Sequence, residues 1–216
     1  MPANPYRQAN FHTGAATLAQ APPDQGWEVA FAGRSNAGKS SAINVLCDQK
    51  DLARISKRPG RTQQLNFFLV DSERRLVDLP GYGYAAVPEA VKQSWQGVMR
   101  DYLIQRASLK GILLVSDIRQ ALTDYDRQLL EWGRVRGLAI HLLLSKADKL
   151  SRGAAIGVQQ RIQAELAKSG LLVSVQRFSS LKKEGILQAH EVLNAWLEIP
   201  AEPGPDTLAP ESGHGS

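Results

Sequence analysis

One loop motif constrains this chain more than any other feature. An apolar run at residues 27–32 leads directly into the sequence GRSNAGKS, and a helical pattern follows. This order of strand, loop and helix is the setting that the spacing G-x-x-x-x-G-K-[S/T] requires. The loop comprises Gly33, Arg34, Ser35, Asn36, Ala37, Gly38, Lys39 and Ser40. The sequence therefore predicts a phosphate-binding loop, and a chance glycine-rich turn is the weaker interpretation.

The residue types in this loop suit a chain of phosphates. Gly33 and Gly38 allow the backbone to curl so that successive N–H groups converge on phosphate oxygens, and the following helix adds the dipole of its N-terminus. Lys39 supplies a positive charge to the β- and γ-phosphates, and the Ser40 hydroxyl is a ligand for Mg²⁺. We therefore expect a nucleotide bound with magnesium.

Around the loop, β-rich apolar runs alternate with longer helical patterns, which predicts an α/β fold with a mostly parallel sheet. Strands are predicted at residues 27–32, 65–71, 76–79, 111–116, 139–145 and 172–178, and helices at 39–47, 88–106, 124–135, 152–168 and 183–197. The runs ILLVS and IHLLLS are almost wholly apolar, as are parallel strands covered on both faces. Only residues 72–75 separate the second and third strands, which permits an antiparallel hairpin but not a parallel crossover.

Length and composition indicate a single domain. The chain has 216 residues, of which 43% are hydrophobic and 22% charged, enough for one domain with its own core. We assign residues 27–199 to this domain, residues 1–26 to an arm on its surface, and residues 200–216, rich in Pro and Gly, to a disordered tail. No apolar run approaches the roughly 18 residues of a membrane span, no secretory signal is recognisable, and one cysteine excludes an internal disulfide. We expect a cytoplasmic monomer with no membrane partner.

A later strand indicates which base is bound. Residues 139–145 run into Ser145, Lys146, Ala147 and Asp148. An acid just past the carboxyl end of a strand lies at the ligand edge of such a sheet. Its two oxygens can accept from N1–H and the exocyclic amine of guanine, a donor pair that adenine lacks, and the Lys146 stem can cover the base. The next strand ends in Phe178, Ser179 and Ser180, whose N–H groups can reach the guanine oxygen. The sequence therefore predicts a guanine nucleotide.

Two further segments match the parts of a nucleotide switch. Asp78, Leu79, Pro80 and Gly81 close the third predicted strand, which places a carboxylate near Mg²⁺ and a glycine N–H near the γ-phosphate. Pro59, Gly60, Arg61, Thr62 and Gln63 precede the second strand, and the Thr62 hydroxyl is a candidate for the same metal. We therefore predict Ser40, Thr62 and Asp78 around Mg²⁺, with Asp78 acting directly or through water.

With these segments in this order, the chain resembles the EngB (YihA/YsxC) family of bacterial ribosome-assembly GTPases, in the TrmE-Era-EngA-EngB-Septin-like class. The matching strings are GRSNAGKSS, RPGRTQ, DLPGYGYA, SKADKL and FSSLKKEG, which span residues 33–185. The resemblance implies a Ras-like fold of six strands and about five helices, Mg-dependent binding of GTP and GDP, and slow hydrolysis. It also implies a role in assembly of the large ribosomal subunit, whose loss affects cell division and septation. The family commonly has Thr where this chain has Ser145; the hydroxyl is kept, so we expect a small effect on affinity.

The residue after Gly81 bears on the rate of hydrolysis. Ras-type enzymes place there a Gln that orients the attacking water, whereas this chain has Tyr82, which we expect only to pack. The intrinsic rate should then be low, and a partner or an ion should assist. Asn36 resembles the asparagine of potassium-activated GTPases, which keeps K⁺ open as a second cofactor. No residue is identified as a catalytic base.

The charges suggest a partner. Lys and Arg exceed Asp and Glu to give a net charge of +5, and residues 50–61 hold five basic side chains against one acid. A charge run is usually a solvated face. This one leads into Thr62, so its contacts with RNA phosphates would depend on the nucleotide and on salt. We therefore predict that the segment binds the large ribosomal subunit or its RNA.

Two other functions stay open. A P-loop kinase of a small metabolite would share the phosphate loop, but it would need an Arg-rich lid and no guanine code, so the segment from Ser145 to Asp148 argues against it. A nucleotide-bound structural module that does not turn over is kept open by Tyr82.

Overall fold

The computed structural model describes residues 4–53, 64–82 and 89–200. Its strands are β1 (Asn10–Ala15), β2 (Trp27–Gly33), β3 (Leu65–Leu69), β4 (Arg74–Asp78), β5 (Leu109–Asp117), β6 (Ala139–Ser145) and β7 (Val173–Arg177). Its α-helices are α1 (Lys39–Leu46), α2 (Glu89–Gln105), α3 (Asp124–Arg136), α4 (Arg152–Ala167) and α5 (Ile186–Trp196). None of the helices in these ranges is long and apolar enough to cross a membrane. The tail predicted at residues 200–216 lies outside the described residues, apart from residue 200.

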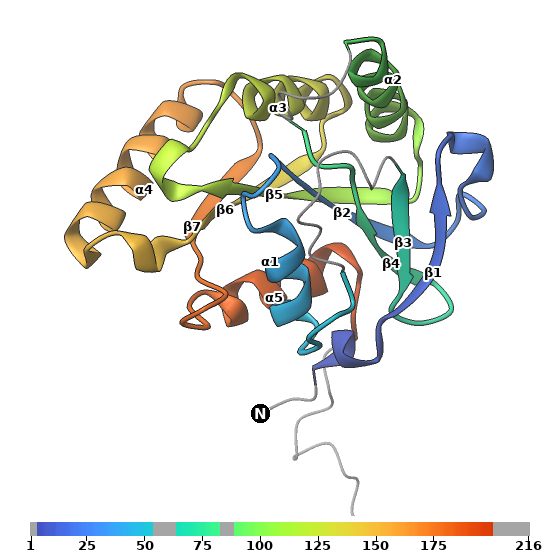
Figure 1. The fold of residues 1–216 in the computed structure, drawn as a ribbon, viewed down its shortest axis with the longest axis horizontal. Coiled ribbons are helices and arrows are strands. Elements are labelled where there is room, and N and C mark those ends of the chain that lie inside the picture. Colours follow the sequence, from blue (N-terminus) through green and yellow to red (C-terminus); the bar gives the residue numbers. More distant parts are fainter. Residues whose placement is uncertain (1–3, 54–63, 83–88, 201–216) are drawn as a thin grey trace, which may run out of the picture.

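The strands form one sheet in the order β1-β3-β4-β2-β5-β6-β7 (Figure 1). From β4 to β7 in this order every pair is parallel, and β3 pairs with β4 in the antiparallel hairpin that the short connection predicts. The predicted α/β fold with a mostly parallel sheet is therefore confirmed. The predicted number of six strands is wrong, because the sheet has seven.

The seventh strand comes from the N-terminal arm. β1 pairs antiparallel with β3, with Ala15 opposite Leu65, and a register shift lies between Phe11 and Thr13. Ala15 is the one fully buried residue of this strand. The strand therefore needs no run of large apolar side chains, and its sequence, NFHTGA, has none. Main-chain pairing at the sheet edge holds this strand, and side-chain patterns do not reveal pairing of that kind.

Two partly buried hydrogen bonds hold the residues before β1 against the domain. The Tyr6 side chain is fully buried, and its hydroxyl donates to Asn194 Oδ1 of α5 at 2.6 Å. Asn4 Nδ2 donates to the Leu46 carbonyl at the end of α1, at 2.9 Å. The arm therefore closes over the ends of two helices before it joins the sheet.

Helices cover both faces of the sheet (Figure 1). Leu114 of β5 and Leu142 of β6 pack in the core under α2, α3 and α4. Their neighbours along the strands, Leu113 and Leu143, pack in the core under α1 and α5. Successive side chains of a strand point to opposite faces, so a strand covered on both sides must be apolar at every position. This accounts for the unbroken apolar runs in the sequence.

A cluster of buried charges lies where β2 begins. Glu28 is fully buried; its carboxylate accepts from Arg106 Nη2 at 2.7 Å, from Arg75 Nε at 2.9 Å and from the Tyr102 hydroxyl at 3.1 Å. Arg106 Nη2 also donates to the Pro22 carbonyl at 2.8 Å. A buried carboxylate is tolerated only when it is paired and hydrogen-bonded in this way. The cluster therefore joins β2, β4 and α2 to the chain that leads from β1.

Candidate nucleotide-binding site

The predicted site segments gather at one edge of the sheet. The central strands β2, β4, β5 and β6 are parallel, so their carboxyl ends lie at the same edge. These ends are Gly33, Asp78, Asp117 and Ser145, and β7 leads to the same edge at Phe178. Ligands of open α/β sheets bind at this edge. The fold therefore brings together the phosphate loop, residues 78–81 and the predicted base-reading segments.

The phosphate loop needs its two motif glycines for different reasons. A Cβ at Gly33 would lie 2.5 Å from the Val115 carbonyl oxygen, because β5 passes directly beside the loop. Gly38 has φ +98°, a left-handed conformation that side chains disfavour, and α1 begins at the next residue. Ala37 N donates to the Arg34 carbonyl at 3.0 Å and closes the turn between them. The loop therefore connects the end of β2 to the start of α1, which is the predicted order of strand, loop and helix.

Lys39 and Asp78 face each other beside this loop. Their side chains are about nine-tenths buried, and the Lys39 ammonium contacts the Asp78 carboxylate. Leu79 then continues beside β2, because its N–H donates to the Phe31 carbonyl at 2.9 Å, and Pro80 and Gly81 follow. A cation from the start of α1 and a carboxylate from the end of β4 therefore lie at one place.

The donor types at this place fit magnesium. Ser40 follows Lys39 in the first turn of α1, so a hydroxyl and the Asp78 carboxylate lie on neighbouring elements. Magnesium prefers oxygen ligands and is commonly held by one or two protein groups together with substrate phosphates. Pro59, Gly60, Arg61, Thr62 and Gln63, which include the third predicted ligand, lie outside the described residues.

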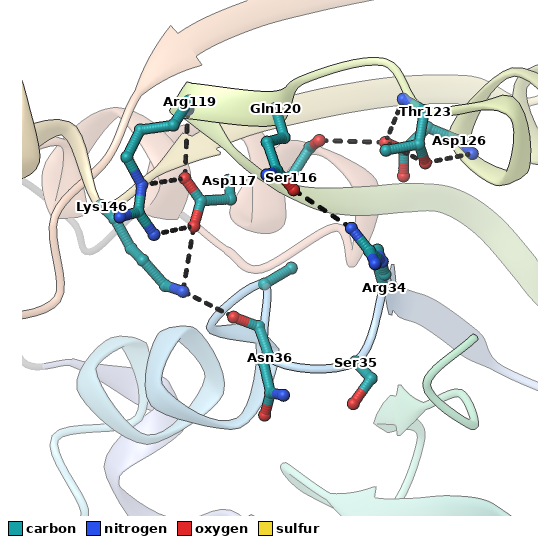
Figure 2. A pocket seen from close by; sticks show the side chains of 11 residues that line it. Arg34, Ser35, Asn36, Ser116, Asp117, Arg119, Gln120, Thr123, Asp126 and Lys146 are labelled. Carbon is teal, nitrogen blue, oxygen red and sulfur yellow. Dashed lines mark hydrogen bonds and ion pairs between the residues drawn. The ribbon is translucent and has the colours of Figure 1, made fainter. Parts of the chain in front are cut away.

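The predicted base-reading segment touches the phosphate loop directly (Figure 2). Lys146 Nζ donates to the Asn36 carbonyl at 2.6 Å. The Ser145 hydroxyl lies within hydrogen-bonding distance of the carbonyls of Ala37 and Ser116, at 3.2 Å from the latter. Both contacts are made by the hydroxyl, which serine and threonine share. Ser145 therefore joins the predicted base-reading segment to the phosphate loop without the methyl group of threonine.

Asp148 is held by the last of the predicted segments. Its side chain is 8% exposed, and its Oδ1 accepts from the Ser179 hydroxyl at 2.6 Å. Ser179 is fully buried, and its Oγ also accepts from the Lys182 N–H at 3.1 Å. Ala147 N donates to the Phe178 carbonyl at 3.1 Å, and Ser180 follows half-buried. The Asp148 carboxylate is therefore fixed in direction before any ligand binds.

Sequence reasoning missed Asp117 and Arg119, which belong to the same edge. Asp117 lies 3.0 Å from Lys146 Nζ, and it accepts from Arg119 Nε at 2.9 Å and Nη2 at 2.7 Å. Partial burial acts to raise the pKa of Asp117, but these hydrogen bonds outweigh it and hold the pKa well below its usual range. The signal that could have found Asp117 is the one used for Asp148, an acid at the carboxyl end of a strand.

A hollow of about 240 Å³ opens between the phosphate loop and the segment that follows β5 (Figure 2). Asn36, Asp117, Arg119 and Lys146 line it on one side. On the other side Arg34 Nη1 donates to Gln120 Oε1 at 3.2 Å. The hollow shares its walls with the loop and with Lys146, so it is part of the same site.

Tyr82 packs in the core, as predicted. It is 6% exposed, and its ring lies beside Tyr125 with the centroids 5.8 Å apart. Its hydroxyl donates to Asp126 at 2.6 Å, so it is directed toward α3 and away from a role in orienting water.

Replacing Ser40 with alanine is expected to impair GTP binding more than GDP binding. The change removes an oxygen ligand, and a metal that bridges the β- and γ-oxygens matters most when both phosphates are present. Titrations of both nucleotides at several Mg²⁺ concentrations measure this. Ser41, the next residue of α1, offers a matched control in Ser41→Ala. Unchanged Mg²⁺ dependence with equal affinities for both nucleotides would exclude Ser40 as a ligand.

The chain is similar in sequence to known GTP-binding proteins. A family model described as 50S ribosome-binding GTPase matches residues 28–146. A "Probable GTP-binding protein EngB" from Methylobacillus flagellatus is 52% identical over 204 residues, which cover 94% of this chain and 99% of that protein. The protein of the same name from Methylococcus capsulatus is 54% identical over 186 residues, covering 86% and 89%.

Solved structures show the same fold. The crystal structure of a probable GTP-binding protein engB matches with a TM-score of 0.64 at 19% identity, over 79% of this chain and 98% of that one. Era in complex with MgGDPNP and a 16S ribosomal RNA segment matches with a TM-score of 0.62 at 19% identity, over 85% and 61%. With a Ras-like GTPase fold, a matching family model and relatives above 50% identity over most of its length, the chain belongs to the EngB family of GTP-binding proteins and is a GTPase.

Proposed function

We propose that this protein is a magnesium-dependent GTP switch that acts in the cytoplasm on the assembling large ribosomal subunit, and that normal cell division and septation depend on it. The observation that carries the nucleotide part is the contact between the phosphate loop and the base-reading segment, in which Lys146 reaches the Asn36 carbonyl at 2.6 Å. The ribosomal part is supported by the family model, whose description names a 50S ribosome-binding GTPase.

Each site residue has a role in this proposal. Residues 33–40 hold the phosphates, with Lys39 as the positive charge on the β- and γ-oxygens. Ser40, Thr62 and Asp78 hold Mg²⁺, which neutralises charge on the phosphate oxygens when it is bound. Residues 145–148 and 178–180 read guanine, and the Ser179 hydroxyl keeps the Asp148 oxygens aimed at the base.

Hydrolysis distinguishes this proposal from a structural module that keeps its nucleotide. Because Tyr82 packs against α3, we expect slow phosphate release by the protein alone and faster release with 50S subunits. Parallel assays in K⁺ and in Na⁺ test whether Asn36 supports a potassium site. No release under any of these conditions would favour the structural module. The small-metabolite kinase considered from the sequence is set aside, because the chain belongs to the EngB family of GTP-binding proteins.

The partner surface is proposed to be the basic segment at residues 50–61. Its first residues are anchored to α1, because the buried Asn44 side chain donates to the Lys50 carbonyl at 2.9 Å and accepts from the Ala53 N–H at 2.7 Å. Its other end leads to Thr62. A γ-phosphate and Mg²⁺ that hold Thr62 would therefore tie the segment at both ends, and RNA binding would then cost less ordering entropy.

Replacing Thr62 with alanine is expected to uncouple ribosome binding from the nucleotide. The variant should still bind GTP measurably through the phosphate loop. Its affinity for 50S subunits, however, should no longer differ between GTP and GDP. Titration against 50S subunits in each nucleotide measures this. A variant that keeps the wild-type difference would show that Thr62 does not transmit the nucleotide state.

The double variant Lys57→Ala/Arg58→Ala should differ from Thr62→Ala, because it removes basic side chains and leaves the predicted metal ligand in place. Ribosome binding should weaken in the GTP state and its salt dependence should flatten by about 0.7–0.9 log units per lost phosphate contact, with nucleotide affinity unchanged. Lys110 and Lys168 are exposed on other elements, so a variant with both replaced by alanine controls for net charge. If the two double variants behave alike at every salt concentration, residues 50–61 are only a solvated face.

A further inference from the structure

Tyr82 joins two parts of the molecule that the sequence places far apart. Its main chain lies against the phosphate loop, because its carbonyl accepts from the Ser35 N–H at 2.8 Å and it forms a bridge with Arg34. Its side chain reaches α3, because its hydroxyl donates to Asp126 Oδ1 at 2.6 Å. The residue that follows Gly81 is therefore fixed at both its backbone and its ring.

Asp126 is itself held in place from several sides (Figure 2). It is 1% exposed, and its second oxygen accepts from the Ser116 hydroxyl at 3.0 Å and from Thr123 N and Oγ1 at 2.9 and 3.0 Å. Thr123 caps α3, and Ser116 belongs to β5. A carboxylate that accepts four hydrogen bonds from three residues, Tyr82, Ser116 and Thr123, cannot turn without breaking several of them.

The Asp126 carboxylate also helps to keep the Tyr82 hydroxyl protonated, so that this hydroxyl can donate a hydrogen bond. Burial raises the pKa of Tyr82 well above its usual range, and the negative charge of Asp126 adds to this effect. The phenol therefore stays protonated at any physiological pH, and a neutral hydroxyl is held by a buried carboxylate. Hydrogen bonds to charged groups are among the stronger ones in proteins.

We propose that Asp126 is a positioning residue for recognition of the γ-phosphate. Through the Tyr82 hydroxyl it holds the Tyr82 main chain against the phosphate loop. This limits where the preceding residue, Gly81, can place its own N–H, which belongs to the peptide between Pro80 and Gly81. The inference rests on the proposed function and on the sequence-based prediction that the Gly81 N–H lies near the γ-phosphate. A group fixed before binding loses less entropy on binding. GDP has no γ-phosphate, so its affinity does not depend on this arrangement.

A purely structural contact would have the same geometry, so the test needs a matched control. Tyr102 provides it: it is fully buried, and its hydroxyl donates to the buried Glu28 carboxylate at 3.1 Å, where β2 begins and the phosphate loop does not reach. Tyr82→Phe and Tyr102→Phe each remove one tyrosine–carboxylate hydrogen bond and no carbon atom. Both should lower the free energy of unfolding, and only the first should change nucleotide preference.

The experiment measures the affinities of GDP and of a non-hydrolysable GTP analogue for the wild type, Tyr82→Phe, Tyr102→Phe and Asp126→Asn, with urea unfolding of each. Tyr82→Phe is expected to lose about three- to tenfold in affinity for the GTP analogue, the range for one lost hydrogen bond, and to keep its GDP affinity. Asp126→Asn should shift the preference in the same direction, and the double variant Tyr82→Phe/Asp126→Asn should shift it no further than Asp126→Asn alone. Tyr102→Phe should leave both affinities unchanged.

Two results would overturn the inference. If Tyr82→Phe loses stability as Tyr102→Phe does while its ratio of GTP-analogue to GDP affinity stays at the wild-type value, the contact only stabilises the fold. If Tyr82→Phe weakens both nucleotides equally, the contact shapes the phosphate loop in general and not the γ-phosphate position. A wild-type protein that binds neither guanine nucleotide would instead reject the proposed function and the inference with it.

Discussion

Replacing Asp148 with asparagine is expected to weaken GDP and GTP by about tenfold or more and to create binding of xanthine nucleotides. The carboxylate accepts from two N–H groups of guanine, whereas an asparagine amide must present one donor in its place. Xanthine carries an oxygen where guanine has its exocyclic amine, so it accepts the hydrogen that the new amide donates. Because the Ser179 hydroxyl holds one Asp148 oxygen at 2.6 Å, the side chain cannot swing away to relieve the mismatch.

Calorimetric titration with GDP, XDP and ADP measures this change in preference. Asp101→Asn is a suitable control, because Asp101 is an exposed carboxylate on α2 that pairs with Arg100 at 3.1 Å, and its loss should leave all three affinities unchanged. Retention of wild-type GDP affinity by Asp148→Asn would show that this carboxylate does not read the base.

Replacing Arg106 with alanine is expected to destabilise the fold by about 3–5 kcal/mol, the usual cost of removing one partner from a buried ion pair. The change removes two hydrogen bonds to Glu28, at 2.7 and 3.0 Å, and the one to the Pro22 carbonyl. Among the described residues, the Glu28 side chain then keeps the hydrogen bonds from Arg75 and Tyr102, and of these two only Arg75 carries a positive charge. The loss is large because it leaves a buried carboxylate with one positive partner fewer.

Urea unfolding followed by tryptophan fluorescence measures this loss. Arg134→Ala is the control, because Arg134 pairs with Glu131 on the surface of α3 and its removal should leave the unfolding midpoint almost unchanged. GDP affinity of the folded Arg106 variant should stay at the wild-type value, because the cluster lies where β2 begins and the phosphate loop follows where β2 ends. Equal midpoints for the two variants would mean that the buried cluster contributes little to stability.

The fold was largely predictable because its strands are covered on both sides. The apolar runs that form β5 and β6 are a direct consequence of helices on both faces. β1 was not predictable in this way. Its place at the edge depends on main-chain pairing with β3, and its one fully buried side chain is Ala15.

Some residues of the candidate site were likewise predictable from the sequence, and others were not. Segments with fixed spacing, such as residues 33–40 and 145–148, could be found because their chemistry restricts the residue types at each position. Asp126 could not, because it acts through Tyr82, a partner distant in sequence. Asp117 follows the same strand-end rule as Asp148, but the sequence does not show its contact with Lys146. Only the folded chain shows that such residues meet.

The most direct test of the account is sedimentation of the protein with purified 50S subunits in the presence of GDP or of a non-hydrolysable GTP analogue. The proposed switch predicts that the protein pellets with the subunits in the GTP analogue and stays largely in the supernatant with GDP. Pelleting to the same extent with both nucleotides, or with neither, would contradict it.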